Sequence, residues 1–391
     1  MKDKLDLFLL VSAVAVIFVG VVSAVAAKGA SVEPVRKIIV FSGEVNEGAQ
    51  ETVVQAVGGV KVKNLDLIGG KVVLLPAHSV GALKNNPRVL RVDDDIILEA
   101  LAKPSLVQPV EVLPWGVDKV DADLVWSITG GAGIKVGIID TGIELDHPDL
   151  AANIKGGYNA IDPTKSANDD NGHGTHVAGI VAAADNEIGV VGVGPAIDLY
   201  AIKVLNRRGS GYLSDVIEGL QWAVANGMQV VNMSLGSSSG NQSFADAVAA
   251  AKSAGLTMVA AAGNSGGAVS YPAAYPEVIA VSATDNNDMI ASFSSRGLEV
   301  DLAAPGVSIY STYKGKTYKT LNGTSMASPH VAGAVALLLT VPAKCDTDLS
   351  GSCSPDEVQT RLESTAYDLG AAGKDALYGA GLLDVGALIL H

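Results

Sequence analysis

From Trp115 onward, short apolar stretches alternate with longer stretches in which apolar residues recur at helical spacing. Short apolar runs are typical of strands that are buried on both faces. Strands regularly separated by helices predict a mostly parallel, doubly wound α/β sheet with helices on both faces, and functional sites lie beyond the carboxyl ends of such strands. The expected strands are 134–139, 198–204, 230–235, 257–262 and 278–282, and the expected helices are 173–184, 214–225 and 244–254, followed by an apolar helix that reaches Leu339.

Length, net charge and cysteine content limit the possible domain organisation and binding partners. The 391 residues are 48% apolar, which is enough for a substantial core and for more than one domain. The formal net charge of −14 argues against a nucleic-acid partner. The two cysteines, Cys345 and Cys353, can form at most one local bridge and no disulfide framework. We expect a monomer.

The N-terminus has the pattern of an export signal. Lys2 and Lys4 precede an apolar run from Leu7 to Ala27 that ends in small residues. The run is almost long enough to span a bilayer, so a retained membrane anchor is the alternative to a cleaved signal at residues 1–27. In both cases the rest of the chain is delivered outside the cytoplasm, and we expect a secreted protein without membrane contact unless the segment is retained.

Residues 28–101 form a second, smaller domain, which residues 102–114 connect to the large one. Its expected elements are a strand at 37–41, a helix at 46–57, strands at 60–67 and 71–75, a short helix at 78–85 and a last strand at 89–98. This β-α-β-β-α-β order predicts a ferredoxin-like fold. A domain of this size buries little surface and is marginally stable by itself. The connecting segment contains Pro104, Pro109 and Pro114, as exposed linkers often do.

A serine lies at the entry of the last apolar helix. The segment from Leu321 to His330 is polar and turn-forming, and it leads directly into Val331–Leu339. At a helix N-terminus the backbone N–H groups lack intrahelical acceptors, so an oxyanion beside Ser325 would be stabilised. A serine before an apolar run is by itself more often a helix cap.

Three other polar residues complete a pattern of acyl-transfer chemistry. Asp140 ends an apolar strand, His173 lies between glycines at a helix start, and Asn264 follows a strand and a glycine. Taken singly, each has an ordinary structural interpretation as a turn residue, cap or core histidine. Together with Ser325 they supply a nucleophile, a base, a carboxylate that orients the base and an oxyanion donor.

Four motifs resemble the signatures of subtilisin-like serine proteases. They are Ile139–Gly142, His173–Gly179, Ala262–Asn264 and Gly323–His330, and they occur in the Asp, His, Ser order of subtilisin. The resemblance extends from about Trp115 to Ile389. It implies a subtilisin-like catalytic domain at 115–391 with Asp140, His173 and Ser325 as the triad of a serine endopeptidase and Asn264 as the oxyanion donor.

The smaller domain resembles the propeptide of the same family, which assists folding of the mature enzyme and then inhibits it. The resemblance implies a self-processing precursor, with cleavage between Leu101 and Ala102. Cleavage next to Pro109 is disfavoured because proline fixes φ and lacks an N–H.

The resemblance also implies a groove for extended protein or peptide substrates, which pair with exposed backbone edges. The pocket residues are small and uncharged, so we expect broad specificity with a preference for apolar residues before the cleaved bond. The implied edges are Gly209, Ser210, Gly211, Ser234, Leu235 and Gly236, and the implied pocket residues are Ala261, Ala262, Gly263 and Ser270.

In this family the loop after the histidine helix holds Ca²⁺, a hard cation that prefers oxygen ligands. Carried over by position, the side chains of Asp149 and Asn186 and the carbonyl groups of Ala184, Ile188 and Val190 are the ligands. Glu111 stands where the family usually has glutamine, which keeps an oxygen and adds charge.

A second calcium site is predicted from spacing alone. The loop from Asp346 to Glu357 has oxygen-bearing side chains, a glycine and a final glutamate at the positions of an EF-hand loop. Its candidate ligands are Asp346, Asp348, Ser350, Ser352 and Glu357. The alternative is an acidic insertion that is closed by a Cys345–Cys353 bridge.

Two other classes of function share features with this chain. A binding protein whose two domains chaperone or inhibit each other without turnover would share the domain pattern. A serine esterase of the α/β-hydrolase type fits poorly, because Ser325 lies in Gly-Thr-Ser-Met-Ala and not in Gly-x-Ser-x-Gly.

Overall fold

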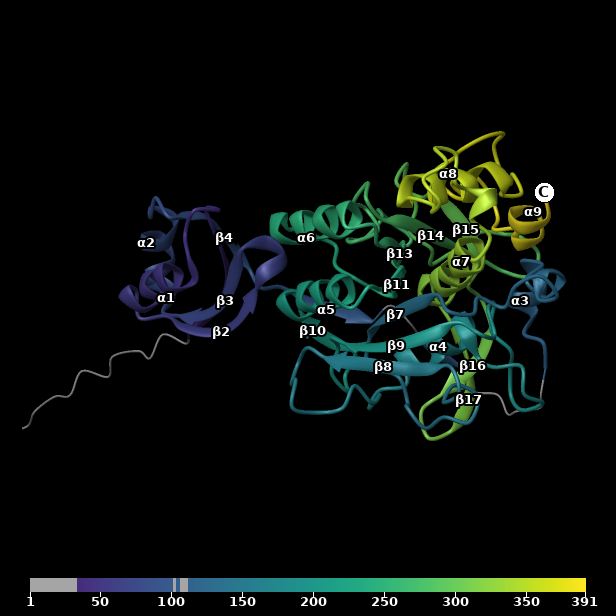
Figure 1. Ribbon diagram of the computed structural model, residues 1–391, viewed down its shortest axis with the longest axis horizontal. Coiled ribbons are helices and arrows are strands. Elements are labelled where there is room, and N and C mark those ends of the chain that lie inside the picture. Colours follow the sequence, from purple (N-terminus) through teal and green to yellow (C-terminus); the bar gives the residue numbers. More distant parts are fainter. Residues whose placement is uncertain (1–33, 101–102, 106–111) are drawn as a thin grey trace, which may run out of the picture. The chain divides into compact units, whose positions relative to one another are not determined.

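The protein is described here by a computed structural model, which covers residues 34–100, 103–105 and 112–391 (Figure 1). The expected export signal at residues 1–27 lies outside the described residues, as do Leu101, Ala102 and Glu111. Among the residues that the structure describes, no helix combines the length and apolar character needed to span a bilayer.

A seven-stranded sheet forms the centre of the large domain. Its strand order is β15-β14-β13-β11-β7-β9-β8, and every neighbouring pair is parallel. The predicted doubly wound α/β fold is therefore confirmed. The strands are β7 (Lys135–Asp140), β8 (Ile154–Asn159), β9 (Asp198–Lys203), β11 (Val230–Met233), β13 (Thr257–Ala261), β14 (Ile279–Thr284) and β15 (Leu302–Pro305).

Helices cover both faces of this sheet (Figure 1). Successive side chains of a strand point to opposite faces, so Val230 joins one hydrophobic core and Val231 the other. α4 (His173–Ala182) and α7 (Thr324–Leu339) pack in the first core, and α5 (Leu213–Ala225) and α6 (Gln242–Ser253) pack in the second. The remaining helices of the large domain are α3 (Trp115–Lys119), α8 (Pro355–Thr365) and α9 (Val385–Leu390).

Several elements were not predicted from the sequence. Among them are the strands β8, β15, β16 (Ile309–Tyr313) and β17 (Thr317–Asn322) and the helices α8 and α9. β8 lies at the edge of the sheet, contains Gly156 and Gly157 and is mostly not buried, so it lacks the continuous apolar run of a central strand. β16 and β17 form an antiparallel hairpin whose polar residues conceal its pattern.

The N-terminal subdomain, residues 35–94, has the predicted β-α-β-β-α-β element order. One face of its antiparallel sheet, ordered β2-β3-β1-β4, packs on its own helices through residues such as Ile39 and Phe41. The other face, which includes Ile38 and Val72, joins the core around α5 and α6. The subdomain thus completes its burial against the large domain. Its elements are β1 (Val35–Phe41), α1 (Glu47–Ala56), β2 (Val60–Leu65), β3 (Gly70–Leu75), α2 (Val80–Lys84) and β4 (Val89–Asp94).

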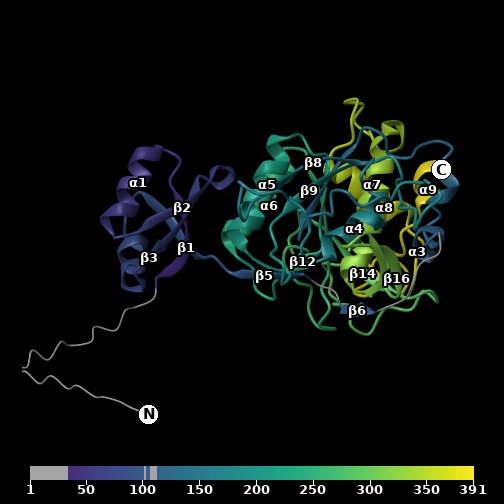
Figure 2. The same cartoon turned by 90° about the horizontal axis from the view of Figure 1, so that it is seen from below.

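The prediction of one last strand at 89–98 is wrong, because the chain leaves the first sheet at Asp95. The buried carboxylate of Asp95 accepts hydrogen bonds from the N–H and the Oγ of Ser214, at 2.7 and 2.6 Å. After this anchor, β5 (Ile97–Ala100) enters a different sheet, between β10 (Ser210–Tyr212) and β12 (Leu235–Gly236) (Figure 2). β6 (Lys103–Ser105) then pairs with β17.

Candidate active site

Asp140 and His173 meet at the carboxyl edge of the large sheet. Asp140 ends β7, and His173 begins α4. The imidazole Nδ1 lies 2.8 and 2.9 Å from the two carboxylate oxygens of Asp140. A Cβ at Gly174 would lie 2.2 Å from the carbonyl oxygen of Gly142, so glycine at 174 allows the helix to approach the strand end this closely. The structure thus brings together an aspartate and a histidine that are 33 positions apart.

The surroundings of His173 favour a charged imidazole in spite of its burial. Burial alone would lower the pKa of His173, which is only 4% exposed. The charge of Asp140, the hydrogen bond to it and the charge of Asp169 together outweigh burial and raise the pKa above its ordinary value. Nε2, the other ring nitrogen, is buried and has no hydrogen-bond partner within the described part of the chain. The imidazole is therefore anchored at one nitrogen and can exchange a proton at the other.

Ser325 is held at the same edge of the sheet. It is the second residue of α7 and is fully buried. Its Oγ donates to the carbonyl oxygen of Ser234 at 3.2 Å, and the Oγ of Ser234 donates back to the carbonyl oxygen of Ser325 at 2.9 Å. Ser234 directly follows β11, which pairs with β7, the strand that ends at Asp140. α7 also packs against α4. The serine therefore lies beyond the carboxyl end of β11, the neighbour of the strand that ends at Asp140.

The Asn264 carboxamide is oriented by the start of α7. Its Oδ1 accepts hydrogen bonds from the N–H and the Oγ1 of Thr324, at 2.9 and 3.0 Å. Because Oδ1 is the acceptor, the NH₂ group is turned toward the other side of the amide and serves as a donor. Asn264 follows β13, the neighbour of β11. The arrangement therefore puts an amide donor and the first turn of a helix beside the serine.

The implied substrate edges hold a segment of the chain itself. β5 pairs antiparallel with β10 and β12, with Leu98 opposite Gly211 and Ala100 opposite Leu235. Ser210 and Gly236 both pair with Glu99, and Gly209 forms the turn before β10. The side chain of Leu98 is completely buried in the core around α5 and α6. The edges therefore bind an extended peptide in this structure.

The four implied pocket residues lie together beside Asn264. Ala261 and Ala262 are fully buried, and Ser270 donates its N–H to the carbonyl oxygen of Ala262 at 2.8 Å. A Cβ at Gly263, which has a φ of +115°, would lie 2.5 Å from the Oγ of Ser270. The close approach of Ser270 and the positive φ therefore require glycine at 263.

The first implied cation site contains a buried carboxylate oxygen without a partner. Asp149 is fully buried, and its Oδ2 accepts from the N–H of Val190 at 3.0 Å. Its Oδ1 is buried and has no hydrogen-bond partner among the described residues. The loop of Ala184, Asn186 and Ile188 lies against it, since Ala184 donates to the carbonyl oxygen of Asp149 at 2.8 Å. An unsatisfied carboxylate oxygen beside loop carbonyl groups fits a hard cation.

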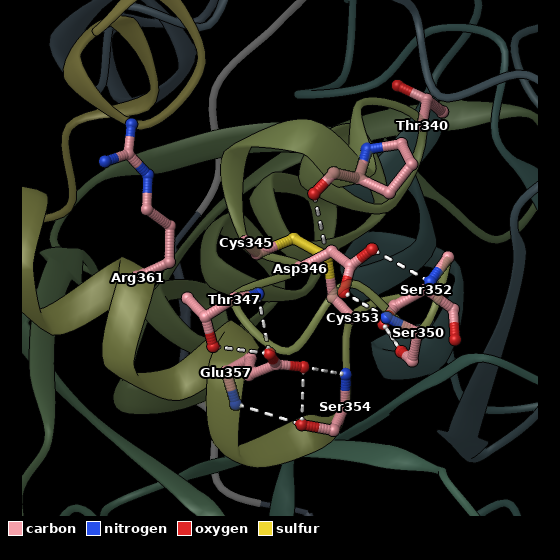
Figure 3. The surroundings of a disulfide bond; sticks show 12 residues. Thr340, Cys345, Asp346, Thr347, Ser350, Ser352, Cys353, Ser354, Glu357 and Arg361 are labelled. Atoms are coloured by element: carbon pink, nitrogen blue, oxygen red, sulfur yellow. Dashed lines mark hydrogen bonds between the residues drawn. A yellow bond between two sulfur atoms is a disulfide. The ribbon is translucent and has the colours of Figure 1, made fainter.

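In the second implied site, the Cys345–Cys353 bridge is formed, and the acidic residues already have partners (Figure 3). One carboxylate oxygen each from Asp346, Asp348 and Glu357 lie within 4.8 Å of one another. Glu357 accepts from the N–H groups of Thr347 and Ser354, at 2.7 and 2.9 Å, and belongs to the capping box of α8. The hydrogen bond from the Thr347 hydroxyl is the main cause that lowers the pKa of Glu357 to about 2.

The other ligands of the second site are also engaged. Asp346 accepts from the N–H groups of Ser350 and Gly351, both at 2.9 Å, and the Oγ of Ser350 donates to the carbonyl oxygen of Ser352 at 2.9 Å. The bridge and the convergence of acidic groups therefore occur together in one loop that folds through its own hydrogen bonds.

Sequence reasoning missed two carboxylates near the site. Asp95 holds the chain at the point where it turns toward the groove, and Asp169 caps the helix that carries His173. The pattern Asp-Asp-Asn-Gly immediately before a helix was the available signal for Asp169, because such residues cap helix N-termini. Nothing in the alternation at 89–98 distinguished Asp95 from an exposed strand residue.

Comparisons with known proteins agree with this geometry. The family model described as "Subtilase family" matches residues 131–381. An alkaline protease of Shouchella clausii is 45% identical over 316 residues, 80% of this chain and 77% of the relative. Subtilisin DY of Bacillus licheniformis is 50% identical over 283 residues, which cover 71% of this chain and 98% of the relative. Subtilisin Savinase of Lederbergia lenta is 48% identical over 278 residues, or 70% and 98%.

The chain therefore belongs to the subtilase family. Its activity within that family is that of a subtilisin-like serine endopeptidase, a hydrolase of peptide bonds in protein substrates.

Proposed function

We propose that the protein is a secreted precursor that cleaves itself after Leu101 and then hydrolyses proteins with a triad of Ser325, His173 and Asp140. The observation that carries this proposal is the bidentate contact of His173 with Asp140 at the edge where Ser325 is held. The N-terminal apolar run supports secretion.

The triad divides the work of acyl transfer. Ser325 Oγ attacks the substrate carbonyl while His173 Nε2 takes its proton, and the same nitrogen later gives that proton to the leaving amine. Asp140 fixes the tautomer, because Nδ1 must carry hydrogen to donate to a carboxylate, and it stabilises the imidazolium. The amide of Asn264 and the backbone N–H of Ser325 donate to the oxyanion.

Self-processing is supported by the two strands that flank the proposed cleavage site. β5 ends at Ala100 in the groove, and β6 begins at Lys103. Lys103 pairs with Asn322 of β17, which leads through Gly323 into the helix of Ser325. The bond between Leu101 and Ala102, which lie outside the described residues, is thus bracketed by strands that pair near Ser325. Cleavage there would leave the apolar residue Leu101 at the new C-terminus, in line with an apolar preference.

The N-terminal subdomain is the inhibitor that remains after cleavage. One face of its sheet packs on α5 and α6, and charged contacts support this packing. Lys63 pairs with Asp215 and Glu218 of α5, at 2.5 and 2.7 Å. Arg36 pairs with Asp95 and stacks 4.1 Å over the ring of Tyr212. Because its own core is small, the subdomain and the enzyme stabilise each other during folding.

Calcium binds at the side chains of Asp149 and Asn186 and at the carbonyl groups of Ala184, Ile188 and Val190. Glu111, which lies outside the described residues, is the remaining ligand. When bound, the cation supplies charge to the unsatisfied Oδ1 of Asp149 and holds the loop to the core. The site is structural and takes no part in the acyl transfer. The loop from Asp346 to Glu357 stays a prediction for a second ion.

The proposal is tested by incubating the purified precursor with Ca²⁺ and casein beside a Ser325→Ala variant. We expect the parent to process itself and degrade casein, and the variant to do neither. A variant that still degrades casein would exclude Ser325 as the nucleophile. A parent that binds its N-terminal subdomain but degrades nothing would favour a binding protein.

A further inference from the structure

A second buried carboxylate lies at the helix that carries His173. Asp169 is 5% exposed, and its two oxygens accept four hydrogen bonds. Oδ1 accepts from the N–H groups of Asn171 and Gly172, at 2.8 and 2.9 Å. Oδ2 accepts from the N–H and the Oγ1 of Thr175, at 3.0 and 2.6 Å. These donors come from residues on both sides of His173, so the carboxylate fixes the backbone from which the imidazole projects.

The charge of Asp169 is not neutralised by a cation in the part of the chain that the structure describes. The neighbouring Asp170 has a side chain that is 54% exposed and pairs with Lys203 at 2.7 Å. Across residues 34–100, 103–105 and 112–391 no such ion pair involves Asp169, whose partners are N–H and hydroxyl groups. A buried charge acts on its neighbours through a poorly screening medium.

Other titratable residues also lie around the start of α4, and each has a defined partner or charge state. Asp140 faces the imidazole from β7, and burial keeps His176 of α4 neutral by lowering its pKa to about 3. From β16, Tyr313 donates its hydroxyl to the carbonyl oxygen of Asn171 at 3.2 Å, and Lys319 of β17 lies over the Tyr313 ring. From β9, the Nζ of Lys203 donates to the carbonyl oxygen of Thr141 at 2.6 Å, and from the turn after β16 the Nζ of Lys314 donates to the carbonyl oxygen of Asp170 at 2.9 Å.

We propose that Asp169 is a positioning residue of the triad, which fixes the first turn of α4 and places a second negative charge beside His173. This inference rests on the proposed role of His173 as the base. Asp169 touches neither substrate nor reacting atoms. It acts through His173, by holding its backbone and by stabilising the imidazolium that forms during each proton transfer.

The direction of its effect follows from charge. A negative charge next to an imidazole favours the protonated form, and the charge of Asp169 contributes to the raised pKa of His173. Removing that charge lowers the pKa, so the base stays unprotonated to lower pH. A cap that served only the fold would change stability and would leave the pH dependence of the rate unchanged.

The experiment compares kcat/KM between pH 5 and 9 for the processed parent enzyme and Asp169→Asn, with an uncharged peptide amide substrate, at low salt and at high salt. We expect the acidic limb of the Asp169→Asn profile to move to lower pH, with a lower plateau. The shift should persist at high salt because the charge is buried. Asp169→Ser, which removes the charge but keeps a capping hydroxyl, serves if Asp169→Asn does not fold.

Two controls separate charge from structure. Thr175→Val removes the hydroxyl that donates to Asp169 and accepts from the N–H of Glu144 but keeps the charge of Asp169, so it should lower the melting temperature without moving the profile. Asp170→Asn removes an exposed, paired charge next in the chain, and its profile should move less than that of Asp169→Asn. Neutral Asp169 variants whose profiles coincide with the parent's would overturn the proposal and make Asp169 a helix cap only.

A readout that needs no turnover separates this inference from the proposed function. NMR titration of the His173 ring in Ser325→Ala precursor, with and without Asp169→Asn, reports the imidazole pKa directly. A lower pKa in the double variant supports the inference even if the parent proves to have no protease activity, and an unchanged pKa overturns it.

Discussion

The edge of the large sheet and the interface with the N-terminal subdomain both bury carboxylates, but they give them different partners. Asp140 faces His173, whereas Asp215 faces Lys63 and Asp95 faces Arg36. An imidazole gains and loses a proton near neutral pH, while lysine and arginine stay charged. The partner therefore decides whether a buried carboxylate supports proton transfer or holds two surfaces together.

The largest effect is expected at the sheet edge. Asp140→Asn keeps the shape of the side chain but removes its charge and favours the wrong imidazole tautomer. In trypsin-type triads the same change lowers kcat by about 10⁴, and we expect a similar loss here. Steady-state kinetics on a peptide amide measure it, with Asp215→Asn, an interface carboxylate that stays in the processed enzyme, as the control. A comparable loss in both variants would contradict the distinction between the two regions.

The pH dependence of the rate sharpens the same comparison. The raised pKa of His173 means that the ring becomes protonated at a higher pH than an ordinary imidazole, and the base is lost below that pH. Activity should therefore fall as pH falls through this pKa. Because the Asp140 contact raises the pKa, its favourable contribution to folding is complete at low pH and is lost as pH rises through the folded-state value. Asp215→Asn at the interface should not move the acidic limb of kcat/KM, and a shift in that variant would contradict this assignment.

Asn264→Ala tests the donor side of the same edge. Removal of the corresponding asparagine of subtilisin lowers kcat by about 10²–10³, and this borrowed magnitude is our expectation here. The loss should appear in kcat with little change in KM, because the donor acts on the transition state. Since Asn264 also accepts two hydrogen bonds from Thr324, the melting temperature is measured in parallel. A change in KM alone would exclude the oxyanion role.

Asp149 represents a third situation, in which one oxygen of the buried carboxylate has no hydrogen-bond partner among the described residues. If Ca²⁺ is that partner, Asp149→Asn should bind one ion fewer by calorimetry. The parent should also lose about 2.7 kcal/mol of stability on chelation from a calcium concentration a hundredfold above Kd. Asp346→Asn is the matched variant, because the Asp346 oxygens have N–H donors. Unchanged stoichiometry in Asp346→Asn would remove the second predicted site.

The smallest effect is expected at the interface. Lys63→Met leaves Glu218 without its cation and Asp215 with only the more distant Arg36, at 3.9 Å, so the inhibition constant of the isolated N-terminal chain should rise at least about tenfold. Lys61→Met is the control, since Lys61 is more exposed and pairs with Glu51 within the subdomain. Equal inhibition by Lys63→Met and the parent chain would show that the apolar face alone provides the affinity.

Elements with a continuous hydrophobic pattern could be predicted from the sequence, whereas elements that depend on contacts between distant residues could not. The central strands and their helices have strong periodicity, so their places follow from local residues alone. The break at Asp95 depends on Ser214, which is 119 positions away, and β8 and the β16–β17 hairpin owe their place to neighbours in the sheet. Likewise, Asp140 and His173 were singled out by motif, but only the folded chain gives their distance.

The central claim is that Ser325 cleaves the chain's own segment between β5 and β6. Intact mass spectrometry of the precursor after incubation, for the parent and Ser325→Ala, tests it most directly. We expect two parent fragments that divide between Leu101 and Ala102, and a Ser325→Ala chain that stays uncut there. A cut at the same bond in Ser325→Ala, or a mature parent chain that begins beyond Val110, would contradict it.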